Sequence, residues 1–441
     1  MSANTEWLQR SLASVWHPCT QMKHHPTLPL VPVARAEGVW LEDFEGKRYL
    51  DGISSWWVNL FGHGNPRINA AITDQLSKLE HVMLAGFTHQ PAIELAERLS
   101  AKTGGVLGHA FFASDGASAT EIALKMSFHA WQNAGLTEKR EFVCLEGSYH
   151  GETVGALSVT DIALFRDAYA PLVRNEHVHL APSPDARLAA PGETAEAVAN
   201  RAADALEALF VARAGKIAAM IIEPLVQCAT GMAMHHPQYL KRVRALCDAH
   251  GAHLICDEIA VGFGRTGTFF AHEQAGIRPD LLCLSKGITG GYLPLSVVLS
   301  TDAIYQAFWD DDVRRGFLHS HSYTGNPLAC RAALATLDIF DTDHVLEQNR
   351  QLSAFITAAL QPLANHPSVN HFRNTGMIWA MDVDNPHADF SRRYFAAAMA
   401  RGILVRPIGK TVYLMPPYVL SENDAQWLSE QMLAALNATL A

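Results

Sequence analysis

The sequence predicts an α/β fold in which a large domain with a mostly parallel central sheet is joined to a smaller α+β domain. Three short apolar runs, at 218–222, 253–256 and 281–284, have the length and composition of strands buried on both faces. From about residue 66 onward, helical and strand patterns alternate, which favours a parallel sheet with helices on both faces. The chain has 441 residues, enough for one large and one small domain.

The large domain is predicted to span 66–315. Within it, apolar residues at helical spacing predict helices over 92–99 and 117–131, and the second of these begins just after a Ser-Asp-Gly sequence. The segment 184–216 is rich in Ala and Pro, and we interpret it as a loop that leads into a surface helix. The sequence does not indicate its role.

The two ends of the chain are expected to lie together. Residues 1–65 are rich in Pro, His and Trp, and after about residue 316 helices are mixed with short strands. We therefore predict a small α+β domain over 316–441, with residues 1–65 packed on it. Short strands are expected at 39–41, 48–50, 377–383 and 411–415.

Charge and composition disfavour several classes of partner. The chain has 34 Lys and Arg residues against 44 Asp and Glu, a net charge of −10, which disfavours nucleic acid and anionic membranes. A local Arg can still bind a small anionic substrate. Pairs of His at 24–25, 235–236, and 319 with 321 lack a consistent spacing to Cys or carboxylate ligands, so we assign no metal.

The cysteines and the N-terminus indicate a soluble cytoplasmic protein. The seven cysteines are scattered and form no Cys-x-x-Cys pair, which is typical of reduced thiols. The first nine residues lack the basic and apolar regions of a signal peptide, and no apolar stretch approaches about 18 residues.

Two polar residues stand where predicted buried strands end. Asp257 closes the second apolar run and Lys286 follows the third. Ligands of open α/β sheets bind at the carboxyl ends of the strands, so both side chains are expected in one crevice. A desolvated Lys suits Schiff-base formation, and an Asp is the partner that a pyridinium nitrogen needs. A structural ion pair is the alternative, and these two residues alone do not decide between them.

Small residues open the predicted helix at 117–131. Ser114, Asp115, Gly116, Ala117 and Ser118 precede or begin it, and backbone N–H groups at a helix N-terminus can bind a phosphate. An ordinary helix cap is the alternative reading. A Lys, an Asp and a phosphate cradle occurring together indicate a cofactor site more strongly than any one of them.

The run DEIAVGFGRTG at 257–267, followed by Pro279-Asp280 and Ser285-Lys286-Gly287, resembles the signature of class III aminotransferases. Asp257 and Lys286 are separated by 29 positions. The resemblance implies the fold-type-I architecture of enzymes that depend on pyridoxal 5'-phosphate (PLP), with the cofactor held as a Schiff base on Lys286. It also implies a homodimer with active sites at the subunit interface.

Further motifs narrow the resemblance to one branch of this class. They are WHP at 16–18, SSWW at 54–57, YHGET at 149–153, GNPLAC at 325–330, RP at 406–407 and MPPY at 415–418. They are similar to the branch that converts 8-amino-7-oxononanoate to 7,8-diaminononanoate in biotin biosynthesis. The implied amino donor is S-adenosylmethionine.

The resemblance also implies roles around the cofactor. Lys286 moves a proton between the substrate Cα and the cofactor, and Asp257 keeps the pyridine nitrogen protonated. Tyr149 lies over the ring, where an aromatic face suits a flat cofactor. Gly116 and Ala117 give backbone N–H groups to its phosphate.

Other implied roles concern the substrate and the second subunit. Arg406 binds the carboxylate of the keto substrate, while Trp56 and Trp57 line the channel for its apolar chain. Ser322 takes a position where the family usually has a Thr that reaches the phosphate of the neighbouring subunit. A packed Trp-Trp pair and a solvated Arg are the alternative readings, as is an inert, packed Tyr149.

Two positions depart from the pattern of the class. Cys19 follows Trp-His-Pro where an aromatic residue is common, and Ser320, assigned to substrate binding, stands where Gly is frequent. Both lie near the expected substrate site, so a lysine-type donor stays open beside S-adenosylmethionine. The rival functions are another class III ω-amino acid or diamine aminotransferase, a PLP-dependent aminomutase or decarboxylase, and a non-catalytic PLP-binding protein.

Overall fold

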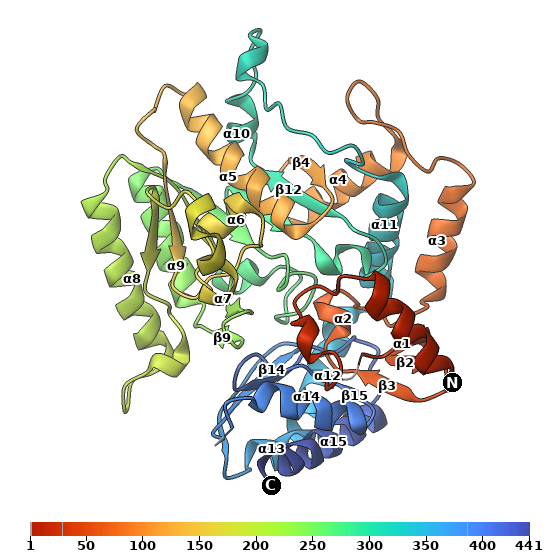
Figure 1. Cartoon of the computed structure of the whole chain (residues 1–441). Helices are drawn as coiled ribbons and strands as arrows, with labels where there is room; N and C mark the ends of the chain where they lie inside the picture. The colour runs from red at the N-terminus through yellow and green to blue at the C-terminus, as the bar shows by residue number, and fades with distance from the viewer. Residues whose placement is uncertain (1, 29, 386) are drawn as a thin grey trace. The chain divides into compact units, whose positions relative to one another are not determined.

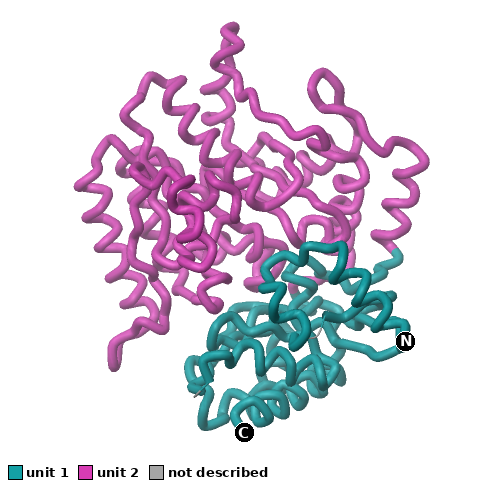
Figure 2. The backbone as a smooth tube through the Cα atoms, viewed as in Figure 1, with its two compact units in different colours: residues 1–66, 347–441 teal, residues 67–346 magenta. Residues whose placement is uncertain are grey.

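A seven-stranded mixed sheet forms the centre of the larger of two units in the computed structural model of the chain (Figure 1). The structure describes residues 2–28, 30–385 and 387–441. Backbone contacts assign 67–346 to this larger unit, called unit 2, and combine 1–66 with 347–441 in unit 1 (Figure 2).

The order of strands in the sheet of unit 2 brings the three predicted apolar runs side by side. The strands are, in spatial order, β4 (His109–Ala113), β12 (Ser296–Ser300), β11 (Leu281–Leu284), β10 (His253–Asp257), β7 (Ile217–Ile222), β5 (Glu141–Leu145) and β6 (Val178–Ala181). The strand β12 is antiparallel to both neighbours, whereas the other pairings are parallel. Ile255 aligns with both Ile221 and Leu281, so β7, β10 and β11 end at the same edge.

Helix α5 (Gly116–Asn133) supplies one layer of the core. Its apolar side chains, including Ile122 and Met126, pack in one buried cluster with strand residues such as Ile221 and Ile255. Side chains alternate between the faces of a strand, so the neighbouring Ile222 points to the opposite face and is fully buried as well. Burial on both faces explains why the central strands appear in the sequence as continuous apolar runs.

Unit 2 contains further helices and two short strands. Figure 1 shows α8 and α9 packed side by side, and α9 also contacts β10. These elements are α3 (Pro66–Leu76), α4 (Gln90–Lys102), α6 (Val154–Ser158), α7 (Ala163–Arg166), η2 (Asp167–Leu172), η3 (Ala186–Leu188), α8 (Ala195–Ala212), β8 (Val226–Gln227), β9 (Ala233–Met234), α9 (Gln238–His250), η4 (Ala271–Ala275), η5 (Lys286–Thr289), α10 (Asp302–Gln306), η6 (Val313–Arg315) and α11 (Pro327–Thr342).

Unit 1 is built from both ends of the chain around two small sheets. In the first sheet β3 pairs in parallel with β15, where Leu50 aligns with Ile403. The second sheet has the order β13-β14-β16. The elements are α1 (Ala3–Ser14), η1 (Met22–His24), β1 (Val33–Glu37), β2 (Trp40–Asp43), β3 (Arg48–Asp51), α2 (Ser54–Trp57), α12 (Val345–Ala359), α13 (Gln361–Ala364), β13 (Val369–Thr375), β14 (Ile378–Val383), α14 (Phe390–Ala400), β15 (Ile403–Leu404), β16 (Thr411–Leu414) and α15 (Glu422–Leu440).

The division of the chain differs from the predicted boundary after residue 315. Unit 2 extends to Leu346, because α11 packs against α4 and η5, which both belong to that unit. The last strand of the large sheet, β12, ends at Ser300, and the sequence then changes from alternating strands to helices. That change of pattern resembles a domain boundary although the unit is not yet complete.

The segment 184–216 folds as the short helix η3 followed by α8, whose buried face includes Val198, Leu206 and Phe210. Within the described parts of the chain, no helix has the length and apolar character needed to cross a membrane.

Candidate active site

Three polar residues gather at the edge where β7, β10 and β11 end. Glu223 follows β7, Asp257 is the last residue of β10, and Lys286 opens η5 two residues after β11. Adjacent parallel strands end at the same edge of a sheet, so these three side chains lie close together. The charges of Asp257 and Glu223 both act on the Lys286 amine. The structure therefore brings the predicted pair together and adds Glu223 to it.

Lys286 has a strained backbone and a perturbed amine. Its φ of 45° lies in the left-handed region, which costs a non-glycine residue about 1–3 kcal/mol and is typical of functional positions. Burial lowers the pKa of the Lys286 amine, although Asp257, Cys228 and Glu223 act in the opposite direction. A lowered pKa increases the fraction of neutral amine, the form that attacks a carbonyl carbon.

The carboxylate of Asp257 is oriented by a buried histidine. Oδ2 of Asp257 lies 2.7 Å from Nδ1 of His150, and Oδ1 accepts a hydrogen bond of 3.1 Å from the backbone N–H of Ile259. Both Asp257 and His150 are buried. The backbone of His150 is fixed in turn, since its N–H donates to Thr160 Oγ1 and its carbonyl oxygen accepts from Thr120 Oγ1.

Glu223 is a site residue that the sequence reasoning did not assign. Burial raises the pKa of Glu223 to about 7, while His150 acts to lower it and Asp257 to raise it. Its two carboxylate oxygens accept hydrogen bonds from the backbone N–H groups of Tyr149 and Cys228, at 3.0 and 3.1 Å. Glu223 follows the buried strand β7 as Asp257 ends the buried strand β10, and this position is the sequence signal that could have identified it.

Tyr149 lies in the loop that follows β5, and hydrogen bonds fix both its backbone and its side chain. Its backbone N–H binds Glu223, and its hydroxyl donates to Glu152 Oε1 at 2.8 Å. The same loop approaches the start of α5 at Gly151, whose φ is 124° and where an added Cβ would lie 2.6 Å from the Cβ of Ala117. A side chain at Gly151 would therefore push the Tyr149 loop away from the helix N-terminus.

The start of α5 has the features of an anion site. The Asp115 carboxylate caps the helix by accepting from the Ser118 N–H at 2.9 Å and from the Ser118 hydroxyl at 2.8 Å. A Cβ on Gly116 would lie 2.9 Å from Cγ2 of Ile259, so glycine allows this turn to pack against the segment after Asp257. The predicted phosphate cradle and the predicted Asp thus belong to adjoining parts of unit 2.

This donor set fits PLP. The cofactor needs an amine for its aldehyde, a carboxylate for its pyridine nitrogen, and N–H groups for its phosphate. Lys286 supplies a desolvated amine, Asp257 a buried and oriented carboxylate, and Gly116 and Ala117 the first N–H groups of an 18-residue helix.

In unit 1, Trp56 and Trp57, two of the predicted substrate residues, lie on a left-handed turn. Trp56 has a φ of 74° and Trp57 a φ of 73°, and each left-handed residue costs about 1–2 kcal/mol. The Trp57 side chain is buried and donates from Nε1 to the hydroxyl of Tyr413 at 3.1 Å. The Trp56 side chain is 44% exposed. Trp57 is thus an anchor in the core, and Trp56 is the member of the pair that presents its ring.

Arg406 contacts Trp56. The guanidinium carbon lies 5.2 Å from the centroid of the Trp56 ring, a cation–π geometry. Nη2 donates to the carbonyl oxygen of Cys19 at 2.9 Å, which is the one hydrogen bond of this side chain to a described residue. Its remaining N–H groups can therefore donate to an anion. Cys19, the position that departs from the family pattern, is exposed and touches this pair through its backbone.

Ser320 and Ser322 lie in the segment between η6 and α11, and both residues are exposed. Beside them, the N–H of His321 donates to Thr324 Oγ1 at 3.1 Å, and His321 Nε2 lies 3.0 Å from His319 Nε2. Among the described residues, no group of three or more His, Cys, Asp or Glu side chains is arranged to hold a metal.

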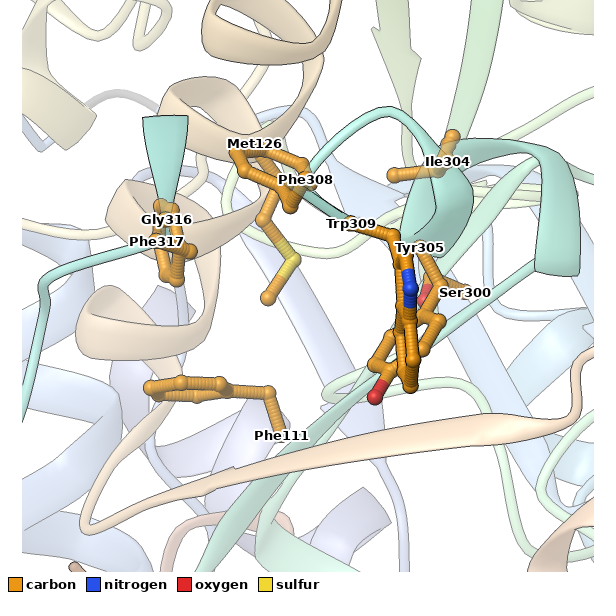
Figure 3. Close-up of a pocket in the computed structure, with 9 residues that line it drawn as sticks. All are labelled: Phe111, Met126, Ser300, Ile304, Tyr305, Phe308, Trp309, Gly316 and Phe317. Atoms are coloured by element: carbon orange, nitrogen blue, oxygen red, sulfur yellow. The ribbon is translucent and has the colours of Figure 1, made fainter. Parts of the chain in front are cut away.

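A separate apolar cavity of about 220 Å³ lies in unit 2. Figure 3 shows Phe111, Phe308, Phe317 and Trp309 around the side chain of Met126. The residues that line it do not include Lys286 or any of the polar residues around it. With so few polar groups, this cavity does not suit a phosphorylated cofactor.

Comparison with known proteins gives consistent matches. Residues 20–436 match the family described as aminotransferase class-III. The chain is 44% identical over 422 residues to a protein from Helicobacter pylori named adenosylmethionine-8-amino-7-oxononanoate aminotransferase, with 94% of each chain covered.

Solved structures agree with this match. The crystal structure of adenosylmethionine-8-amino-7-oxononanoate aminotransferase from Methanocaldococcus jannaschii has a TM-score of 0.91 and 32% identity, covering 98% of this chain and 99% of the other. An amine transaminase from an uncultivated Pseudomonas species, solved in its PLP-bound form, has a TM-score of 0.89 and 32% identity, covering 97% and 98%.

Proposed function

The chain belongs to the PLP-dependent class-III aminotransferases, and from this premise we propose that it transfers an amino group to 8-amino-7-oxononanoate to give 7,8-diaminononanoate in biotin biosynthesis. The observation that carries the reaction type is the shared strand-end edge of Lys286 and Asp257, where burial lowers the pKa of the lysine amine. The choice of substrate is supported by the 44% identity to the Helicobacter pylori protein.

When bound, PLP supplies an electron sink that stabilises negative charge on the substrate Cα. The residues of the chain hold and move protons around it. Lys286 takes the proton from the Cα of the amino donor and later returns one to the acceptor carbon. Asp257, oriented by His150, holds the proton of the pyridine nitrogen in place.

The loop that contains Tyr149 and the start of α5 position the cofactor. The Tyr149 ring would lie over the pyridine ring and exclude water from it. Gly116 and Ala117 donate backbone N–H groups to the phosphate, whose negative charge is stabilised by the helix N-terminus.

Arg406 binds the carboxylate of the keto substrate, and Trp56 packs against its apolar chain. The support is the arrangement in unit 1, where the guanidinium lies over the Trp56 ring and keeps N–H groups for an anion. Trp57 supports the turn from behind, because its ring is buried. Ser320 is assigned to the same substrate site.

We further propose a cytoplasmic homodimer with its active sites at the subunit interface. Ser322 would then reach the cofactor phosphate of the neighbouring subunit, a role supported by its exposed position. The cytoplasmic location is supported by seven free cysteines, which suit a reducing compartment.

S-adenosylmethionine is the proposed amino donor, with a lysine-type donor as the alternative because Cys19 and Ser320 depart from the family pattern. The rival function is that of an amine or ω-amino acid aminotransferase. The likeness to the amine transaminase from Pseudomonas supports this rival. A substrate with a carboxylate and a long apolar chain uses both Arg406 and Trp56, which a simple amine does not.

The test is a pair of single-turnover reactions followed by absorption. The PLP-loaded enzyme is mixed with S-adenosylmethionine or with lysine, and conversion to the amino form of the cofactor identifies the donor. Addition of 8-amino-7-oxononanoate should then restore the original spectrum. If a simple ω-amine converts the cofactor but 8-amino-7-oxononanoate does not restore it, the rival function is correct.

A further inference from the structure

The turn that carries Trp56 is left-handed throughout. Ser54, Ser55, Trp56 and Trp57 have φ values of 53°, 46°, 74° and 73°, and none of them is glycine. The turn is closed by backbone hydrogen bonds from Trp57 to Ile53 and from Val58 to Ser54. Because L-residues avoid this conformation, four in succession persist only when side chains around them hold the turn.

One carboxylate holds the first half of the turn. Oδ1 of Asp51 accepts from the backbone N–H of Ser55 at 2.9 Å, and Oδ2 accepts from the Ser55 hydroxyl at 2.7 Å. Oδ1 also accepts a longer hydrogen bond, of 3.4 Å, from the N–H of Ile53. Asp51 is fully buried. Such a charge is tolerated in the interior only when hydrogen bonds satisfy it, so the turn and the carboxylate stabilise each other.

A histidine fixes Asp51 from the other side. His63 Nε2 lies 3.1 Å from Asp51 Oδ2, and the Asn59 amide nitrogen lies 3.2 Å from His63 Nδ1. An amide nitrogen only donates, so Nδ1 accepts and the ring proton of a neutral His63 is on Nε2, where it donates to Asp51. The backbone of His63 pairs with that of Gly38 in both directions.

The first and last residues of the turn, Ser54 and Trp57, are fixed on another part of unit 1. The Ser54 hydroxyl donates to the carbonyl oxygen of Met415 at 2.8 Å, and Trp57 donates to the Tyr413 hydroxyl. Trp56 is therefore the one side chain of the turn that is both large and exposed, and it meets the Arg406 guanidinium.

We infer that Asp51 is a positioning residue for the substrate site: it holds the left-handed turn and thereby sets the Trp56 ring against Arg406. The inference rests on the proposed function, in which this pair binds the apolar chain and carboxylate of the keto substrate. Asp51 is fully buried, so its effect on the substrate site passes through its hydrogen bonds to Ser55.

The first test observes Trp56 directly and uses no substrate. Acrylamide quenching is measured in Asp51→Asn and in the natural protein, each compared with its own Trp56→Phe counterpart so that the difference isolates Trp56 among the nine tryptophans. We expect a higher quenching constant for Trp56 in Asp51→Asn. An unchanged constant in a folded variant would overturn the inference, whatever the substrate of the enzyme is.

The second test is rescue by glycine. Gly adopts positive φ without a steric cost, so Ser55→Gly should let the turn form without the carboxylate. In the double variant Asp51→Asn/Ser55→Gly, both the quenching constant and the KM for the keto substrate should return toward the natural values. Failure of a folded double variant to recover either quantity would show that Asp51 acts through general packing and not through the turn.

Kinetics give the third measurement. Asp51→Asn should raise the KM of the acceptor half-reaction by about tenfold to a hundredfold, as expected for a misplaced binding group, with a smaller effect on kcat. Trp56→Ala should give the same split. If Trp56→Ala and Arg406→Ala both leave this KM unchanged, the proposed function fails, whereas an effect in these two and none in Asp51→Asn refutes the inference alone.

Asp43→Asn is the matched control. Asp43 is also buried in unit 1, and its carboxylate caps the turn between β2 and β3 by accepting from the N–H groups of Glu45 and Lys47. Its substitution should lower stability without moving Trp56 quenching. If Asp51→Asn does not fold, the same readouts are taken on Ser55→Ala, which removes only the hydroxyl donor, and unchanged quenching and KM there would equally overturn the inference.

Discussion

Nδ1 of His150 lies 2.7 Å from Oδ2 of Asp257, with both side chains buried beneath the edge where Lys286 emerges. A buried carboxylate with a fixed partner keeps one orientation. The histidine thus aims the carboxylate toward its ligand, although it comes from a loop more than a hundred positions earlier in the chain.

The aiming of Asp257 by His150 can be separated from its charge. Asp257→Asn should still be saturable with added PLP. Its kcat should fall by at least about 100-fold, because an amide cannot hold the proton of the pyridine nitrogen. His150→Ala should lower kcat less, by about tenfold to a hundredfold, since the carboxylate remains but loses its orientation. Stopped-flow half-reactions measure both. A normal rate in Asp257→Asn would refute the assigned role.

Lys286 should be the attachment point of the cofactor. Replacement by Ala should abolish the visible absorption band of the lysine-bound cofactor and reduce turnover to background, because it removes the buried amine on which the charge of Asp257 acts. Lys241→Ala, on the polar face of α9, is a suitable control with both properties unchanged. Retention of the band in Lys286→Ala would disprove the central assignment.

Glu223 predicts a specific dependence of stability on pH. Its pKa is raised from the ordinary 4.5 to about 7, so the folded protein holds a proton that the unfolded chain releases between these values. The stabilisation is complete below about pH 4.5 and is lost as the pH rises through about 7. At 1.36 kcal/mol per pKa unit it amounts to about 3 kcal/mol. Glu223→Gln should lack this loss when unfolding free energies of the cofactor-free protein are compared across the range; parallel profiles would contradict the prediction.

Arg406 should affect the two half-reactions unequally. Arg406→Ala removes the carboxylate partner of the keto substrate and should slow the acceptor half-reaction more than the donor half-reaction. Arg406→Lys should recover only part of the loss, because an ammonium retains the charge but not the two-pronged geometry of a guanidinium. Transient kinetics of each half-reaction provide the comparison. Equal losses in both, or no loss, would remove the carboxylate assignment.

The central strands of the large sheet could be predicted from the sequence because burial on both faces leaves a clear pattern. The strands β7, β10 and β11 are buried on both faces, which produces short apolar runs with abrupt polar ends, and these ends placed Asp257 and Lys286 together. The predicted boundary after residue 315 differs from the end of unit 2 at Leu346, because the helix α11 follows the last strand and packs on the same unit. A helix gives no local sign of the unit it packs on.

Other features of the site could not be predicted from the sequence. Four consecutive left-handed residues with the sequence Ser-Ser-Trp-Trp contradict local propensity, and they depend on the Asp51 carboxylate. The difference between the buried Trp57 and the half-exposed Trp56 follows from that turn and from Tyr413, which lies over 350 positions away. Glu223 lies at a strand end that the sequence predicts. Its partners are backbone N–H groups, which every residue except proline has, so the sequence gives no sign of this interaction.

The pairing of β3 with β15 determines when unit 1 can close during synthesis. Leu50 aligns with Ile403, so the first strand must wait for 403 − 50 = 353 further residues, or roughly 20–70 s at ribosomal rates. Until then one edge of β3 lacks its parallel neighbour and can pair with other chains. A released chain that ends at Leu346 should therefore be cut by protease within 1–66 while 67–346 resists. Equal protease resistance of both parts would show that residues 1–66 fold without the strand β15.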